Sequence, residues 1–132
     1  MMKKIILVLL LTSASLFATA SQAYISPSFL KKKMVIIDIR TKGEWIQTGI
    51  LKGSITETFF DEKGRYDIRK FIDVVKANVD VKKGETFALI CATGSRSNML
   101  ASFLGQNGFN VIDLTNGILG AQQQRMQLVP YK

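Results

Sequence analysis

The 132-residue chain carries 18 basic and 10 acidic side chains, a formal net charge of +8, with one cysteine and no histidine. The absence of histidine excludes a Ser-His-Asp triad, a Cys-His couple and histidine-based metal sites. Because no basic stripe is interleaved with aromatic residues, the positive charge favours small anions over nucleic acid as partners.

Residues 1–23 have the pattern of a secretory signal peptide. Lys3 and Lys4 precede an apolar stretch, and small residues follow it. We expect cleavage after Ala20 or after Ala23, and the pattern fits both positions. The apolar run is shorter than the roughly 20 residues of a spanning helix, so no stable membrane insertion is expected. Residues 24–132 are then expected to form one domain in a periplasmic or secreted protein.

The rest of the chain alternates predicted helices and strands. The predicted elements, in order, are a helix from 26 to about 32, a strand over 34–38, a helical turn from 42 that ends at Thr48-Gly49, a strand over 54–57, a helix from 66 to about 78, a strand over 87–90, a helix from Ser97 to Asn107-Gly108, a strand over 110–114 and a last helix after Asn116-Gly117. This order predicts an α/β domain with a small, doubly wound, mostly parallel sheet covered by helices on both faces.

Two charged residues, Asp38 and Arg40, follow the strand predicted over 34–38. In open α/β sheets, ligands bind at the edge formed by the carboxyl ends of the strands. Asp38 and Arg40 are therefore either supporting residues of a site or an ion pair that ties loops together.

The chain's one cysteine, Cys91, lies where a predicted strand ends and a helix begins. Backbone N–H groups and the helix dipole at such a position stabilise an anion, and Arg96 adds a positive charge. Both effects favour the thiolate form of Cys91. An unpaired cysteine in an exported protein indicates a reactive thiol or an intermolecular bridge. The alternative is that Cys91 is a small buried apolar residue.

Five segments together resemble the single-domain rhodanese family, and they span nearly all of the chain after the signal peptide. These segments are 35–40, Glu44-Trp45, 49–55, 91–97 and 111–118. The resemblance implies a rhodanese-like α/β fold and a sulfurtransferase in which Cys91 carries a persulfide. A small anionic donor such as thiosulfate would load Cys91, and cyanide or an external thiol would unload it, with no metal or organic cofactor. The implied anion-binding loop comprises Ala92, Thr93, Gly94, Ser95, Arg96 and Ser97, with Asp38 and Arg40 in support.

The chain departs from the family pattern in three ways. Ile50 and Lys52 stand where the family often has histidine and proline. Ala92 and Thr93 stand where many members that use thiosulfate have a cation early in the loop, which bears on the identity of the donor. The chain has no second cysteine to resolve a persulfide, so the acceptor must be external.

Two other functions fit the same residues. Cysteine-dependent phosphatases use a related loop with five residues between cysteine and arginine, whereas four residues, Ala92 to Ser95, intervene here. A shorter loop offers fewer donors to a phosphate. The second alternative is a non-enzymatic sulfur carrier that binds one protein partner and delivers persulfide to it, because the same loop serves binding and catalysis.

Overall fold

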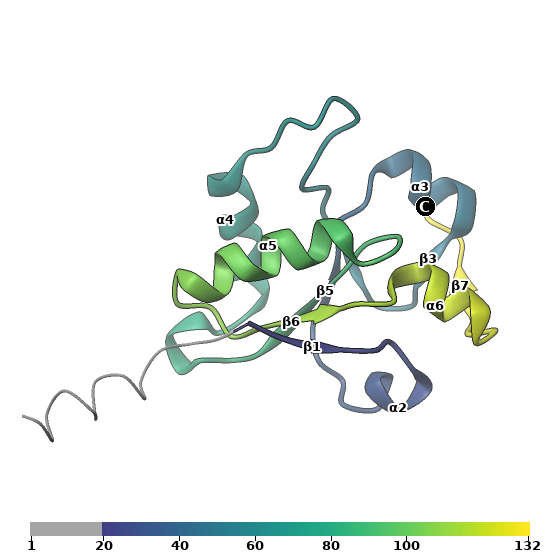
Figure 1. Ribbon diagram of the computed structural model, residues 1–132, viewed down its shortest axis with the longest axis horizontal. Helices are drawn as coiled ribbons and strands as arrows, with labels where there is room; N and C mark the ends of the chain where they lie inside the picture. Colours follow the sequence, from purple (N-terminus) through teal and green to yellow (C-terminus); the bar gives the residue numbers. More distant parts are fainter. Residues whose placement is uncertain (1–19) are drawn as a thin grey trace, which may run out of the picture.

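A five-stranded parallel sheet forms the centre of the molecule, which the computed structural model describes over residues 20–132 (Figure 1). Its strands, in spatial order, are β1 (Ala20–Ala23), β6 (Val111–Leu114), β5 (Phe87–Ile90), β2 (Ile36–Asp38) and β4 (Ile55–Thr56). Every pairing is parallel. The predicted α/β class is confirmed. The predicted signal peptide lies, up to residue 19, outside the described residues.

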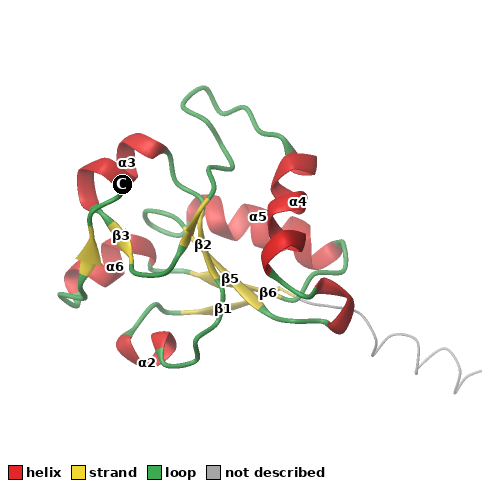
Figure 2. Ribbon diagram, turned by 180° about the vertical axis from the view of Figure 1, so that it is seen from behind, coloured by secondary structure: helices red, strands yellow, loops and turns green. Residues whose placement is uncertain are grey.

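Helices cover both faces of this sheet (Figures 1 and 2). One core contains residues of α4 (Ile68–Asn78) and α5 (Ser95–Gln106), and the other contains residues of α2 (Pro27–Leu30) and α6 (Gly117–Gln123). Successive residues of a strand point to opposite faces, so Leu89 enters the first core while Ala88 and Ile90 enter the second. This double burial explains the continuous apolar runs of the central strands.

Side-chain caps fix where several helices begin. The Ser26 hydroxyl accepts a hydrogen bond from the backbone N–H of Phe29 at the start of α2. Thr41 and Glu44 form a capping box at the start of α3 (Lys42–Thr48), and Asp67 caps α4. These polar residues satisfy N–H groups that have no partner within the helix. A short 3-10 helix, η1 (Val81–Lys83), leads into β5.

Two strand pairings lie outside the sequence prediction. β3 (Ile50–Leu51) pairs antiparallel with β7 (Leu128–Val129), and this brings the Tyr131 ring to 5.1 Å from the Trp45 ring. β1 pairs with β6, so the sheet begins at Ala20, four residues before the expected start of the domain at residue 24. Within residues 20–132, no helix combines the length and apolar character that crossing a membrane requires.

Candidate active site

Cys91 lies at the carboxyl end of the central strand β5 and is fully buried. The strands on either side, β2 and β6, run parallel to β5, so Asp38 and Asp113 also lie toward this edge of the sheet. The location is the ligand-binding edge of an open α/β sheet, as expected for the site.

Backbone N–H groups surround the sulfur of Cys91. The N–H groups of Gly94 and Ser97 donate to Sγ at 3.2 and 3.4 Å, and the Ser97 hydroxyl oxygen lies 3.3 Å from Sγ. The predicted helix start at Ser97 is wrong by two residues, because α5 begins at Ser95. The first turn of this helix, rather than a preceding loop, therefore supplies one of the two N–H groups.

Gly94 allows the chain to turn so that these backbone N–H groups approach Cys91 Sγ. Its φ of +103° belongs to the region that side chains rarely adopt, and a Cβ there would collide with the Thr115 carbonyl. On the other side of the loop, the carbonyls of Cys91 and Ala92 accept hydrogen bonds from Ile118 and Leu119 of α6. The loop is thus held between α5 and α6. Thr93 and Ser95 are exposed and Ala92 is half-buried.

Arg96 pairs with a carboxylate of α3. Its two terminal nitrogens donate to the oxygens of Glu44 at 2.7 and 2.8 Å. These bonds lower the pKa of Glu44 to about 2, and the same contact with Glu44 raises the pKa of Arg96. The positive charge of Arg96 is therefore shared with Glu44, a partner that was not predicted from the sequence.

Asp38 and Arg40 form a buried ion pair with an N–O distance of 2.8 Å. Arg40 also donates to the Thr48 hydroxyl and the Gly49 carbonyl, and the Trp45 indole N–H donates to Asp38 at 3.0 Å. All of these contacts join the end of β2 to α3 and the residue after it. Asp38 and Arg40 therefore form a structural ion pair that links β2 to α3, one of the two roles expected from the sequence.

Asp113 of β6 is a second buried carboxylate and was not among the site residues predicted from the sequence. Its oxygens accept from the Ser97 hydroxyl at 2.6 Å and from the Asn98 amide at 3.2 Å. Ser97 thus touches both Asp113 and Cys91. An acidic residue inside an otherwise apolar strand, as in the run 111–114, was the available signal.

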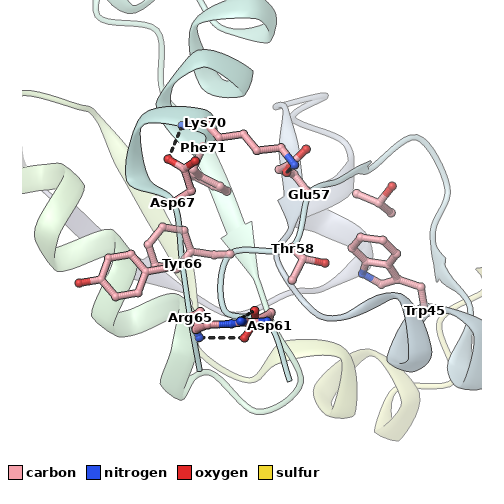
Figure 3. A pocket seen from close by; sticks show the side chains of 11 residues that line it. Trp45, Glu57, Thr58, Asp61, Arg65, Tyr66, Asp67, Lys70 and Phe71 are labelled. Atoms are coloured by element: carbon pink, nitrogen blue, oxygen red, sulfur yellow. Dashed lines mark hydrogen bonds and ion pairs between the residues drawn. The ribbon is translucent and has the colours of Figure 1, made fainter. Parts of the chain in front are cut away.

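A small hollow of about 230 Å³ borders the loop and includes Ala92 and Thr93 in its lining. A larger hollow of about 560 Å³ lies elsewhere, between Trp45 and the start of α4 (Figure 3). Two of its charged groups bind each other: the backbone N–H and the side chain of Arg65 both donate to Asp61, which lowers the pKa of Asp61. Cys91 lines neither hollow, but the two residues that follow it line the smaller one, which is therefore the better candidate for a substrate. Residues 20–132 contain no cluster of three potential metal ligands among histidine, cysteine, aspartate and glutamate.

Known proteins match most of the chain. The family model described as Rhodanese-like domain matches residues 26–124. A tRNA uridine(34) hydroxylase of Acinetobacter baylyi is 37% identical over 90 residues, which cover 65% of this chain and 26% of that protein. The chain therefore spans about a quarter of the length of this curated relative.

Two solved structures have the same fold. A rhodanese-related protein of Thermoplasma volcanium is 25% identical with a TM-score of 0.61, and the match covers 79% of this chain and 91% of that one. A protein of Staphylococcus saprophyticus subsp. saprophyticus is 27% identical with a TM-score of 0.51, over 72% of this chain and 88% of that one. The rhodanese-like fold expected from the sequence is confirmed.

Proposed function

The chain belongs to the rhodanese-like domain family, and we propose from this premise that it is a sulfurtransferase whose Cys91 carries a persulfide. The observation that carries the proposal is the direction of two backbone N–H groups, those of Gly94 and Ser97, toward Sγ. N–H groups in this position stabilise negative charge on sulfur. They favour the thiolate that attacks the donor and then the persulfide anion that forms.

The reaction consists of two displacements. The Cys91 thiolate attacks the outer sulfur of a donor such as thiosulfate, a new S–S bond forms, and sulfite leaves with the electron pair of the broken S–S bond. Cyanide or a thiolate then attacks the outer sulfur of the persulfide. The S–S bond at Cys91 breaks, thiocyanate or a new persulfide leaves, and the Cys91 thiolate is restored. Charge and sulfur balance in each step.

Access to the sulfur requires the loop to move. Cys91 has no exposed surface, and the residues beside it are the half-buried Ala92 and the exposed Thr93. An added sulfur atom would lie about 2 Å beyond Sγ, the ordinary length of an S–S bond. We therefore propose that Ala92 and Thr93 shift outward when a donor reacts, toward the solvent side of the hollow that they line.

Intact-mass measurement tests the proposal. After incubation with thiosulfate or a low-molecular-weight persulfide, the protein should gain the mass of one sulfur, and cyanide or a reducing thiol should remove it. Cys91→Ser should fold and gain nothing. If no donor modifies the wild type, or if the protein instead hydrolyses an aryl phosphate through Cys91, the sulfurtransferase proposal is wrong.

One observation favours the carrier function as a second candidate. In the described part of the chain, Arg40 is the one cationic side chain that lines the hollow beside Ala92 and Thr93, and it is paired with Asp38. Thiosulfate would find little uncompensated positive charge there. A carrier should load from a persulfide donor and transfer sulfur to a partner protein's thiol much faster than to cyanide. Comparable rates with cyanide would favour the enzyme.

A further inference from the structure

Asp113 is a buried carboxylate held by neutral groups. It is 1% exposed, and its recorded partners are the Ser97 hydroxyl at 2.6 Å and the Asn98 amide at 3.2 Å. Among the ion pairs formed within residues 20–132, none includes Asp113. Burying a carboxylate anion without a cationic partner is costly, so this position is suited to a carboxyl group that can hold a proton.

The Ser97 hydroxyl connects Asp113 to Cys91. Its oxygen lies 2.6 Å from Asp113 Oδ1 and 3.3 Å from Cys91 Sγ, and all three side chains are buried. A serine hydroxyl has one hydrogen, and an ionised carboxylate can only accept. When Asp113 is ionised, it therefore takes the hydrogen of Ser97 in preference to the Gly94 carbonyl, which is neutral and lies farther from Ser97 Oγ, at 3.2 Å. The oxygen of Ser97 then presents a lone pair to Cys91, which suits a thiol and opposes a thiolate.

We propose that Asp113 is a positioning residue that shares one proton with Cys91 through Ser97. The S–H bond of Cys91 breaks and its proton passes to Ser97 Oγ, while the original Ser97 hydrogen passes to Asp113 Oδ1. Ser97 keeps one hydrogen, now directed at Sγ, and the total charge is unchanged. The inference rests on the proposed function of Cys91. It provides a proton acceptor within a chain that has no histidine.

The surroundings of Asp113 favour this exchange because the side chains that face Asp113 carry no charge, whether the proton lies on Cys91 or on Asp113. On the neighbouring strands, Gln22 of β1 and Leu89 of β5 are its register partners. On α5, the contacts come from Ser97 and Asn98, and the cation of the same turn, Arg96, is bonded to Glu44. The charge of Arg96 also interacts with Cys91, so this cation favours the state in which the proton lies on Asp113 and the negative charge on Cys91.

The variant Asp113→Asn tests the role because its amide matches the carboxylate in shape and cannot accept a proton. Its oxygen can face Asn98 and its NH₂ group can donate to Ser97, which frees the hydrogen of Ser97 for Sγ or for the Gly94 carbonyl, 3.2 Å from Ser97 Oγ. The thiolate should then form at a pH lower by about one unit than in the wild type, because a competing negative charge is gone. The ultraviolet absorbance of the thiolate measures this in a protein with one cysteine, after subtraction of Cys91→Ser.

A double-mutant cycle separates transmission through Ser97 from direct repulsion between charges. If Ser97 carries the effect, Asp113→Asn should shift the midpoint much less in a Ser97→Ala background than in the wild type. An equal shift in both backgrounds, or no shift in either, overturns the inference. None of these measurements depends on sulfur transfer, so they test the inference even if the protein does not gain sulfur in the loading experiment.

A measurement on the wild type, with Cys91→Ala as its control, covers the case in which the variants of Asp113 and Ser97 fail to fold. With carbon-13-labelled aspartate, the infrared band of a protonated carboxyl should persist until thiolate formation is complete. In the Cys91→Ala variant, measured at the same pH, this infrared band should be absent. If all aspartates are already ionised while the thiolate is forming, no proton is shared and the proposal is wrong.

Discussion

Gly94 sets the geometry of the sulfur site at the scale of one residue. Its backbone has a φ of +103°, and its Cα faces the carbonyl of Thr115. We expect Gly94→Ala to lower the free energy of unfolding by about 2–4 kcal/mol, because it adds both backbone strain and a collision with a backbone atom. Sulfur loading should also slow, since the N–H group that Gly94 directs at Sγ moves. Urea unfolding and intact-mass kinetics measure the two effects.

Gly43 provides the matched control. It lies in α3, its φ is not positive, and a Cβ added there has nothing within 4 Å. Gly43→Ala should keep the loading rate and leave stability unchanged or raise it by up to about 1 kcal/mol, because alanine favours helix. Similar losses in both variants would show that the backbone of Gly94 has no special part in the site.

At the scale of elements, the ion pair between Glu44 and Arg96 joins α3 to α5, and its effect depends on pH. The pKa of Glu44 is about 2 in the folded protein against an ordinary 4.5. A depressed folded pKa gives stability that is present above pH 4.5 and is lost as pH falls toward 2. Both side chains are about 30% exposed, and solvent screens part of the gain.

Glu44→Gln should therefore unfold more easily than the wild type at pH 7, by about 1–2 kcal/mol, and the difference should shrink as pH falls from 4.5 to 2. Glutamine can still serve in the capping box with Thr41, so the change isolates the charge. Glu62→Gln, in an exposed loop, makes the same change of charge and should have little effect. A difference that is constant with pH would contradict the expected role of the ion pair.

At the scale of the whole molecule, β1 bears on how an exported chain would be processed. Ser21, Gln22 and Ala23 each have a register partner on β6. Cleavage after Ala23 would remove this strand and expose the edge of the sheet beside β6. We propose that the protein is exported and that cleavage follows Ala20, because the remaining three residues can still pair.

Two shortened chains, 21–132 and 24–132, compare the possible products. The chain from residue 24 should be less stable by about 2 kcal/mol or more, because it loses several backbone hydrogen bonds. Urea unfolding gives the difference, and light scattering detects association through the uncovered edge. N-terminal sequencing of the protein from a periplasmic fraction should begin at Ser21. A start at Tyr24, or recovery of the intact chain from membranes, would contradict the proposal.

The sequence predicts the parts of this molecule that depend on local pattern. β5 has the predicted bounds, and the burial of β2 and β6 follows from their apolar runs. Cys91 could be placed at a strand end because an apolar run precedes it and a helical pattern follows. β3 and β7 have two residues each and form only because distant segments meet, so no local pattern marks them.

Side-chain partnerships across the fold were beyond sequence reasoning for the same physical reason. Glu44 and Arg96 are 52 residues apart, and their contact depends on how α3 and α5 pack. The sequence could show that Arg96 follows the cysteine and could not show which carboxylate binds it. Asp113 was visible as an acid within a strand, but its contact with Ser97 requires the parallel arrangement of β5 and β6.

The contact between Trp45 and Tyr131 gives the molecule a built-in optical reporter. The chain has one tryptophan, so its fluorescence comes from one place, where Trp45 bonds to Asp38 and meets the C-terminal segment. Tyrosine can pass excitation energy to a nearby indole, and the 5.1 Å between the rings is short enough for efficient transfer. Arg40, bonded to the same Asp38, lines the hollow beside Ala92 and Thr93. Emission from Trp45 should therefore report changes at Asp38 and at the Arg40 bonded to it, without any attached label.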